Sequence, residues 1–532
     1  MEYSTHKPHA VCIPLPAQGH INPMLSLAKL LHSRGFYITF VHTEFNYHKL
    51  HDSASLESTS VEDFQFETVS DGLPPDNLRG ILDLPALACS VPVHTLESFR
   101  QLIKKLNSSP LLPPVSCIVS DGVMGFTLKV AREFGIPEIL FFTSSACGVL
   151  GYLQFEKLIE KGYFPLKDES YLCNGYLDAT TVEWTTPMGS IRLRDLPTFL
   201  RTTNADDILF NYNMEAVNNA VKTGSIILNT FDELEQEVLD VLKTKFPNLY
   251  TVGPLPLLCQ QICDQKLESI KSSLWREDEK CLEWLEGKEA RSVVYVNYGS
   301  LVIMTPKQLH EFAWGLANSK YPFLWVIRPN LVNGGTEVIS QDFLDEIKGR
   351  ALILDWCPQE KVLSHPSVGA FLTHCGWNST LESICQGIPI VCWPFFAEQQ
   401  MNCLYACTQW GIGVEIDADV ERGEVEGLLR ELMEGRKGVE LREKVLEWKK
   451  RGERASRPEA KPSRFFGDIA DKPNGAYNSG QKLQHELEKL LKLEGNDCCT
   501  KLFNQENQME EEALPEKEEQ PLEITLMFGF VF

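Results

Sequence analysis

The sequence predicts an α/β protein built from two doubly wound domains that face a cleft, followed by an atypical acidic C-terminal tail. Three observations support this prediction. The chain has 532 residues, which is too long for one hydrophobic core of ordinary size. Short apolar runs alternate with segments of helical spacing, and this alternation restarts after Leu249. An apolar content of 43% is sufficient to fill two cores.

The first domain opens with a βαβ unit. His9–Leu15 is a short, mostly apolar run of the kind that forms a buried strand, and Asn22–Arg34 has helical spacing. We expect Asn22 to cap this helix and Pro23 to lie in its first turn. Phe36–Thr43 is the next strand.

A second βαβ unit follows, and the design then recurs in the second domain. Its predicted elements are the strand 115–120, the helix 126–134 and the strand 139–142. Successive units of this kind favour a parallel sheet covered by helices. In the second domain the predicted strands are 292–296, 322–327, 351–355, 369–373 and 388–392.

Changes in composition give the domain boundaries. We expect an N-terminal domain over 1–250, a linker and entry segment over 251–290, and a C-terminal domain over 291–450. An atypical insertion with a crossing helix is expected over 451–495, and a disordered acidic tail over 496–532. Residues 501–532 hold eight Glu against two Lys, a net charge of −6.

Charge and composition exclude several classes of protein. A formal net charge of −23 opposes binding to nucleic acid or to anionic membranes. The first residues lack the apolar stretch of a signal peptide, and the sixteen cysteines show no paired CxxC spacing. The most membrane-like window, 136–155, is interrupted by Glu138 and three hydroxyl residues. We therefore expect a cytoplasmic monomer with reduced thiols and no stable membrane insertion.

The stretch HCGWNSTLES, from His374 to Ser383, indicates an anion site. It follows the predicted strand 369–373 and opens a helix from Asn378. The free N–H groups and the dipole at a helix start favour a diphosphate, and His374 adds a donor. Glu382, one turn further, is able to accept hydrogen bonds from ribose hydroxyls. Helix capping alone would explain Asn378 but not the whole group.

Residues Trp356 to Gln399, WCPQEKVLSHPSVGAFLTHCGWNSTLESICQGIPIVCWPFFAEQ, closely resemble the 44-residue signature box of plant-type UDP-glycosyltransferases, which are family 1 glycosyltransferases. With decreasing sharpness the resemblance extends from about His9 to about Lys450. It is closest to the subfamily that glucosylates iridoids, other terpenoids and cyanohydrins. The resemblance implies a GT-B fold of two Rossmann-like domains, UDP-glucose as co-substrate and transfer with inversion. Because the helix dipole and the donors at positions 374 to 379 can neutralise the charge of the leaving UDP, no metal or other cofactor is predicted.

The resemblance also implies roles for individual residues. For the nucleoside they are Trp356 stacking on uracil, Gln359 contacting the nucleoside and Glu382 holding the ribose. For the diphosphate they are His374, Asn378 and Ser379, with Ser300 nearby. For the sugar they are Trp377, Glu398 and Gln399. Glu398 replaces the Asp that is commoner in the family but keeps the carboxylate, and Gln399 rather than His favours glucose over galactose.

The base is predicted in the other domain. Transfer to an alcohol needs a group that takes the hydroxyl proton, and an imidazole does so near neutral pH. His20 lies in PAQGHINP after the first strand, and Asp121 follows the strand 115–120. Asp121 would orient His20 and stabilise its charged form, as the acid does in a hydrolase triad. The resemblance assigns this dyad to matching positions.

One pattern suggests a metal, since Asp417 and Asp419 form an Asp-x-Asp triplet. They precede the helical pattern 420–432, where acidic residues at a helix start are ordinary capping, so no metal site is predicted.

The sequence says less about the acceptor substrate. Phe142, Phe155 and Phe210 are available to line a pocket, although core packing is the expected role of any single one of them. The inference extends no further than a small lipophilic alcohol. Residues 472–493 resemble the helix that in this family crosses back onto the first domain.

Two alternatives remain at this point. One is a non-catalytic nucleotide-sugar binder whose altered C-terminus prevents closure. The other is a nicotinamide-dependent oxidoreductase, which the missing GxGxxG after the first strand argues against.

Overall fold

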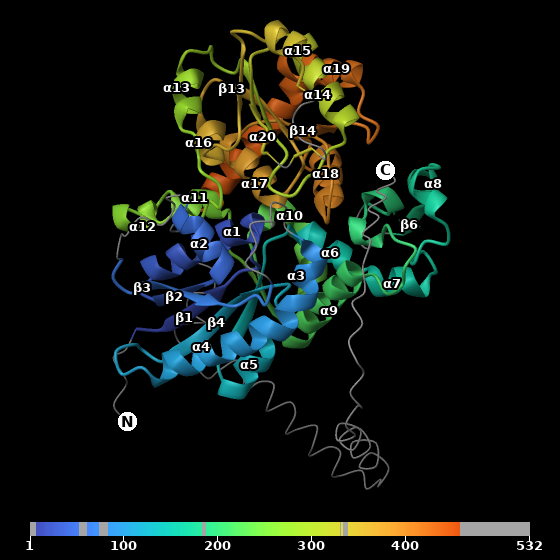
Figure 1. Ribbon diagram of the computed structural model, residues 1–532. Helices are drawn as coiled ribbons and strands as arrows, with labels where there is room; N and C mark the ends of the chain where they lie inside the picture. The colour runs from blue at the N-terminus through green and yellow to red at the C-terminus, as the bar shows by residue number, and fades with distance from the viewer. Residues whose placement is uncertain are drawn as a thin grey trace, which may run out of the picture. The chain divides into compact units, whose positions relative to one another are not determined.

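A computed structural model describes residues 7–52, 61–73, 83–183, 188–329, 331–332 and 339–457. For residues 51 and 52 it describes the backbone but not the side chains. All of these residues belong to one compact unit. Two parallel sheets with helices on both faces make up this unit, so the predicted α/β class is confirmed (Figure 1). We call the described residues between 7 and 275 the N-terminal lobe and those between 276 and 457 the C-terminal lobe.

The N-terminal lobe contains a seven-stranded parallel sheet. In spatial order its strands are β3 (Phe64–Val69), β2 (Tyr37–Thr43), β1 (His9–Ile13), β4 (Val115–Asp121), β5 (Glu138–Phe142), β8 (Ser225–Leu228) and β9 (Asn248–Thr251). Side chains alternate between its faces, as the pleat requires. Ala10 and Cys12 pack toward α1 (Gln18–Ser33), whereas Val11 and Ile13 pack toward α4 (Leu96–Ser108) and α5 (Thr127–Phe134).

The C-terminal lobe contains a six-stranded parallel sheet. In spatial order its strands are β12 (Ala351–Leu354), β11 (Phe323–Val326), β10 (Val293–Asn297), β13 (Val368–Thr373), β14 (Ile390–Cys392) and β15 (Gly413–Glu415). Helices α14 (Pro306–Ser319) and α19 (Arg422–Glu434) cover one face, and α17 (Trp377–Gln386) and α20 (Arg436–Ala455) lie on the other.

The remaining elements are short or peripheral. They are the helices α2 (Glu44–Asp52), α3 (Leu84–Ser90), η1 (Val91–Thr95), α6 (Ala146–Leu153), α7 (Phe155–Glu160), η2 (Glu169–Leu172), α8 (Tyr176–Ala179), η3 (Leu193–Asp195), η4 (Thr198–Leu200), α9 (Ile208–Thr223), α10 (Asp232–Lys243), α11 (Leu255–Cys259), α12 (Gln265–Ser269), α13 (Lys280–Glu286), α15 (Gln341–Glu346), α16 (Gln359–Ser364) and α18 (Gln399–Thr408), and the hairpin of β6 (Thr181–Glu183) and β7 (Ser190–Arg192). Among the described residues, no helix combines the length and the apolar character needed to cross a membrane.

Each sheet reverses its strand order once, next to its central strand. In the N-terminal lobe β1 lies between β2 and β4, and in the C-terminal lobe β10 lies between β11 and β13. In open parallel sheets such a reversal leaves a crevice beyond the carboxyl ends of the strands, because the flanking connections turn away in opposite directions. The fold therefore provides one crevice beside β1 and β4 and another beside β10 and β13.

Helix α1 starts earlier than predicted. It begins at Gln18 with Ala17 as its N-cap residue, so Pro23 lies in the helix interior and the expected capping role of Asn22 is wrong. Proline has no N–H, and its position leaves the carbonyl of Gly19 without the usual donor four residues on. The side-chain amide of Asn378, from the C-terminal lobe, donates to this carbonyl at 2.8 Å. A contact between the lobes thus replaces the missing helix hydrogen bond.

Further hydrogen bonds join the lobes in a buried seam. Two indole N–H groups of the C-terminal lobe donate to main-chain carbonyls of the N-terminal lobe, Trp377 to Asn229 at 2.8 Å and Trp410 to Leu234 at 3.1 Å. Ser145 donates to the side-chain oxygen of Asn402 at 2.6 Å. Apolar residues of both lobes form one continuous cluster around these bonds.

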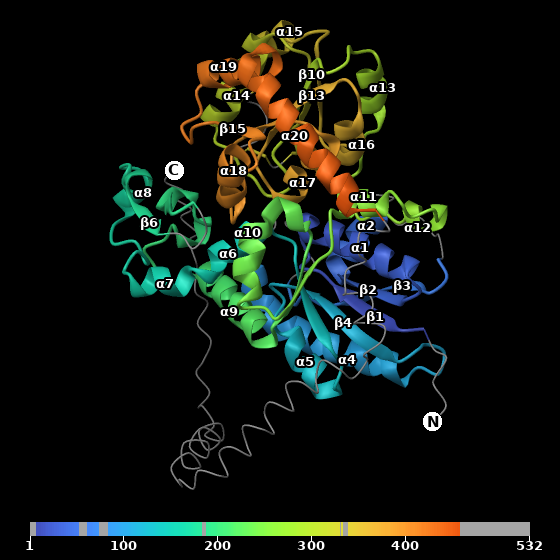
Figure 2. The same ribbon diagram turned by 180° about the vertical axis from the view of Figure 1, so that it is seen from behind.

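Helix α20 adds a second connection between the lobes. It runs along α17 and ends beside α11 of the N-terminal lobe, as Figure 2 shows. Gly452 lies against Pro254 and Leu257, and Arg454 pairs with Glu233 at 3.3 Å. The crossing helix predicted over 472–493 and the acidic tail lie outside the described residues.

A buried carboxylate in the C-terminal lobe predicts a pH-dependent stability. Glu311 on α14 accepts two hydrogen bonds from the Arg422 side chain on α19, and these lower the pKa of Glu311 to about 2. A depressed carboxyl pKa stabilises the fold above the unfolded value and loses that effect as the pH falls toward 2. We expect Glu311→Gln to cost about 1–2 kcal/mol at pH 7, measured by urea unfolding, and less at pH 3.

The matched control is Glu426→Gln, which removes an exposed pair with Arg430 on the same helix. It should cost less than about 0.5 kcal/mol at either pH, since solvent screens such pairs. Equal effects of the two substitutions would contradict the assignment of Glu311.

Candidate active site

All twelve residues predicted for the site line one cavity of about 580 Å³. The cavity lies between the carboxyl edges of the two sheets and takes residues from both lobes. His20 and Asp121 come from the N-terminal lobe, and the other ten come from the C-terminal lobe.

His20 and Asp121 form a close pair at the strand-order reversal of the first sheet. Nδ1 of His20 is 2.8 Å from Oδ2 of Asp121, and 28% of the His20 side chain is accessible against 2% for Asp121. The main-chain amides of Leu15 and Val123 donate to the Asp121 carboxylate and fix its orientation. Because Nδ1 is held by the acid, Nε2 is the nitrogen left to accept a proton.

The environment of His20 favours its protonated form. Burial lowers the pKa of the imidazole, but the charge and hydrogen bond of Asp121, together with the charge of Glu398, outweigh burial and raise the pKa above its usual value. Thr143, which sequence reasoning missed, places its hydroxyl 3.0 Å from Nδ1. A polar residue directly after strand β5 was the available signal, since that position lies at the same sheet edge.

The start of α17 meets the cavity from the opposite side. Gly376 is the N-cap residue, and Trp377, Asn378 and Ser379 occupy the first turn. Burial, reinforced by the charge of Arg328, lowers the pKa of His374 to about 4, so this imidazole is neutral at pH 7. His374 therefore offers a hydrogen-bonding ring rather than a positive charge.

Arg328 holds the loop that carries Ser300. Its guanidinium donates to the main-chain carbonyls of Gly299 and Val302. Gly299 has a positive φ of 72°, and a Cβ there would lie 2.5 Å from Nε2 of His374. Glycine is thus required for Ser300 and His374 to line the same part of the cavity.

A buried network positions the residues predicted for the nucleoside. The amide nitrogen of Gln359 donates to Glu382 at 2.7 Å and to Ser379 at 3.0 Å. Its oxygen accepts from Asn297 at 2.9 Å and from the hydroxyl of Tyr295 at 3.1 Å. Burial, with the nearby charge of Glu360, raises the pKa of Glu382.

Sequence reasoning missed Asn297 and Tyr295. Asn297 is the last residue of β10, and a polar residue at a strand's carboxyl end was again the available signal.

Trp356 lines the cavity beside a second tryptophan. The ring centroids of Trp356 and Trp275 are 5.8 Å apart with an interplanar angle of 31°. Lys49 lies over the outer ring at 4.5 Å from the Trp275 centroid. The predicted stacking surface is therefore backed by an aromatic pair.

The residues predicted to bind the sugar differ in how many of their hydrogen-bonding groups are already used within the protein. Glu398 accepts a hydrogen bond from the hydroxyl of Tyr152 at 2.7 Å, and a Cβ on Gly148 would lie 2.6 Å from its Cγ. The side-chain oxygen of Gln399 accepts from the amides of Phe395 and Phe396, each at 2.9 Å, which leaves its NH₂ for a ligand. The indole N–H of Trp377 is already used in the lobe seam, so its sugar contact stays a prediction.

Of the three phenylalanines predicted for the acceptor side, Phe142 lines the cavity. Phe155 and Phe210 instead stack on each other in a separate cluster with a centroid distance of 5.1 Å, and they are not among the cavity residues. Single apolar residues do not distinguish a pocket wall from a core in sequence, because both exclude water.

The Asp-x-Asp triplet lies away from the cavity. The exposed Asp417 accepts a hydrogen bond from the amide of Asp419 at 3.3 Å, and α19 starts at Arg422 with no side-chain cap. The two acids thus form a turn before the helix instead of its first turn.

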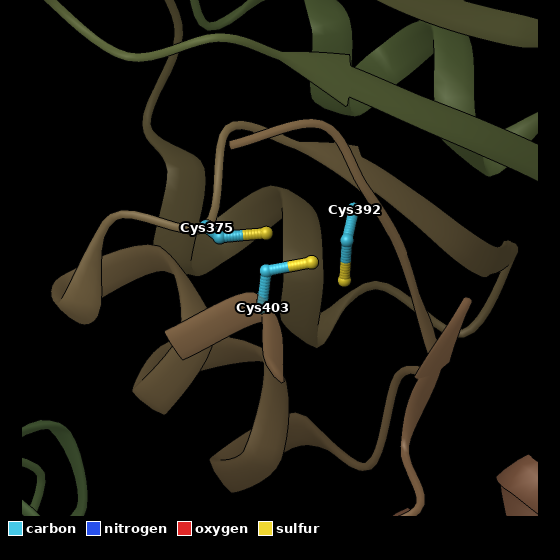
Figure 3. A group of neighbouring side chains, drawn as sticks. All are labelled: Cys375, Cys392 and Cys403. Atoms are coloured by element: carbon cyan, nitrogen blue, oxygen red, sulfur yellow. The ribbon is translucent and has the colours of Figure 1, made fainter. Parts of the chain in front are cut away.

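Three buried thiols lie together behind the start of α17. Cys375, Cys392 and Cys403 point toward one another with sulfur atoms within 4.8 Å (Figure 3). The pKa of Cys375 is raised by burial, which favours the neutral thiol. All cysteines in the described residues are free. We interpret the three as core packing, in keeping with the exposed fractions of 1% or less.

Comparisons with known proteins agree with this geometry. Residues 204–440 match the family described as UDP-glucoronosyl and UDP-glucosyl transferase, and residues 9–120 match the family described as glycosyltransferase, N-terminal domain. A 7-deoxyloganetin glucosyltransferase of Gardenia jasminoides is 56% identical over 454 residues, which are 85% of this chain and 94% of that protein. A (R)-mandelonitrile beta-glucosyltransferase of Prunus dulcis is 53% identical over 458 residues, covering 86% and 95%.

The fold is shared with solved structures. UGT2 of Phytolacca americana, complexed with UDP-2fluoro-glucose and pterostilbene, superposes with a TM-score of 0.71 at 28% identity and covers 88% of this chain and 100% of that chain. The expected GT-B fold and the expected use of a UDP-sugar with a small-molecule acceptor are thereby confirmed. The chain belongs to the UDP-glucoronosyl and UDP-glucosyl transferase family and is a UDP-glycosyltransferase.

Proposed function

We propose that this enzyme transfers glucose from UDP-glucose to a small lipophilic alcohol with inversion, giving a β-glucoside. One observation carries the proposal: the paired His20 and Asp121 open into the same cavity as the start of α17. This arrangement brings a base on one lobe opposite an anion-binding helix start on the other, as direct displacement at an anomeric carbon requires.

His20 is the proposed general base. Its Nε2 takes the proton of the acceptor hydroxyl while that oxygen attacks the anomeric carbon of glucose. Asp121 holds Nδ1–H, fixes the tautomer and stabilises the imidazolium that forms. The bond from the anomeric carbon to the diphosphate oxygen breaks as the new bond forms, so an α-linked glucose becomes a β-glucoside.

The leaving UDP is stabilised by dipoles of the protein. The amides at the start of α17, the side chains of Asn378 and Ser379 and the neutral ring of His374 converge on the cavity. Such preorganised donors stabilise developing charge in a site shielded from water. We infer that transfer needs no metal, and that Ser300, Trp356, Gln359 and Glu382 bind the phosphates and nucleoside.

The acceptor class follows from the relatives and the cavity. The two named relatives act on 7-deoxyloganetin and on (R)-mandelonitrile. Apolar side chains from the N-terminal lobe form much of the wall near His20. The proposal is therefore a compact, mostly apolar alcohol of the iridoid, terpenoid, phenolic or cyanohydrin type. Neither a nicotinamide-dependent activity nor a non-catalytic binder is favoured, and a cytoplasmic monomer stays a prediction from the sequence.

The test of this function is transfer itself. Incubation with UDP-glucose and a panel of terpenoid, phenolic and cyanohydrin alcohols should give products one hexose heavier, detected by mass spectrometry, and EDTA should leave the rate unchanged. His20→Ala should lower kcat by about 100-fold or more while the Kd for UDP stays the same, because the base does not contact UDP. UDP binding with no transfer by the unmodified enzyme would support the non-catalytic alternative.

The raised pKa of His20 predicts the acid side of the rate profile. Only the neutral imidazole acts as a base, so kcat/KM should fall as the pH drops through a value above the usual 6.5. Asp121→Asn removes the charge that raises this pKa. We expect the midpoint to move to lower pH and kcat to fall by about 100-fold. An unchanged midpoint in this variant would show that another group governs the profile.

The bond between Tyr152 and Glu398 predicts a coupling across the lobes. Tyr152 fixes one carboxylate oxygen, which leaves the other for a sugar hydroxyl. Tyr152→Phe should lower kcat/KM for UDP-glucose by about tenfold without changing the Kd of UDP.

Glu398→Asp shortens the side chain and withdraws it from Tyr152. Adding Tyr152→Phe to that variant should then have little further effect. Additive losses in this double-mutant cycle would argue against the coupling.

A further inference from the structure

The acceptor side of the cavity carries polar groups that no described residue satisfies. Among the described residues, several buried side-chain nitrogen or oxygen atoms have no hydrogen-bond partner. Three of the residues concerned line the cavity: His374, Ser144 and Tyr212. His374 belongs to the diphosphate side already described. Ser144 and Tyr212 belong to the N-terminal lobe and have no role in the proposed mechanism.

Ser144 and Tyr212 come from separate elements, and both line the cavity that also contains His20. Ser144 directly follows Thr143, whose hydroxyl is 3.0 Å from Nδ1 of His20. Tyr212 lies on α9, next to Asn213, which also lines the cavity. Burial raises the pKa of Tyr212, and the charges of Asp121 and Glu215 act in the same direction. The phenol therefore stays protonated and is a hydrogen-bond donor at neutral pH.

The cavity wall around the two hydroxyls consists mostly of apolar side chains, which cannot form hydrogen bonds with them. Side chains from α3, from the ends of β4 and β5, from η4 and from α9 contribute Leu84, Leu87, Val123, Phe142, Phe199 and Leu209. A buried hydroxyl without a partner destabilises the protein, so such groups in native proteins usually meet a water or a ligand. Because this cavity receives the substrate, we expect the substrate to supply the missing hydrogen-bond partner of these two hydroxyls.

We propose that Tyr212 and Ser144 form an acceptor-recognition site for a hydrogen-bond acceptor group carried next to the reacting alcohol, such as a carbonyl, a nitrile or an ether oxygen. The inference rests on the proposed function and narrows its acceptor class. The preferred acceptor is an apolar body with two adjacent polar features, one hydroxyl that His20 deprotonates and one lone pair that the two hydroxyls bind. Sites built to hydrogen-bond a substrate group discriminate strongly against analogues that lack it, because their own polar groups are then left unpaired.

The experiment compares two acceptors that the wild-type enzyme glucosylates and that differ only in this group. Mandelonitrile and 1-phenylethanol form such a pair, since a methyl replaces the nitrile beside the same alcohol. We expect the wild-type enzyme to prefer the polar member in kcat/KM. Tyr212→Phe should reduce this preference by about tenfold, and Ser144→Ala should reduce it in the same direction. Neither substitution should change the KM for UDP-glucose or lower kcat/KM for the apolar member.

A matched control uses Tyr298, whose hydroxyl is also buried and without a described partner but lies outside the cavity, against Phe312 and Trp393. Tyr298→Phe should leave the acceptor preference unchanged, and the melting temperature of both phenylalanine variants should be kept or raised.

Three outcomes would overturn the inference. They are equal losses with both acceptors, an unchanged preference in both cavity variants, and a wild-type enzyme that glucosylates only alcohols lacking such a group. Failure to glucosylate any alcohol would instead contradict the proposed function.

Discussion

The active site depends on where the two parallel sheets reverse their strand order. Beside β1 and β4 the reversal brings His20 and Asp121 within 2.8 Å although 101 positions separate them. Beside β10 and β13 it brings Ser300 and His374 to one wall of the same cavity. Both residues of each pair lie close together because parallel strands have their carboxyl ends at the same edge of the sheet. The proposed mechanism requires that these two edges face each other.

Contacts between the two lobes keep the carboxyl edges of the two sheets facing each other. Pro23 removes a hydrogen bond from α1, and Asn378 supplies the missing donor from the other lobe. Asn378 is also one of the residues predicted to bind the diphosphate. Its side-chain amide has two N–H groups, so the hydrogen bond to Gly19 and a hydrogen bond to the diphosphate either share these two donors or compete for one of them. The two buried tryptophan bonds of the seam, from Trp377 and Trp410, add further contacts between the lobes.

Much of the fold and the site could be predicted because the central strands are apolar runs with site residues at or shortly after their carboxyl ends. Asp121 ends β4, His374 directly follows β13, Ser300 comes three residues after β10, and His20 comes seven residues after β1. The strands β8, β9 and β15, which lie at or next to a sheet edge, have three or four residues each, too few to show a period. The start of α1 was missed because its lost backbone bond is replaced from residue 378, which local sequence cannot reveal. Likewise, Tyr152 was missed because its partner Glu398 is 246 positions away.

The two cavity histidines show how the lobes divide the chemistry. Both imidazoles are buried to some degree, and burial alone lowers the pKa of either. Asp121 reverses the effect at His20 and raises its pKa, whereas Arg328 reinforces it at His374 and brings the pKa to about 4. Groups whose environments push their pKa values apart are suited to different tasks. In the proposed mechanism the His20 ring is therefore the group that takes the proton, whereas the His374 ring stays neutral at pH 7 and is suited to hydrogen bonding to a diphosphate.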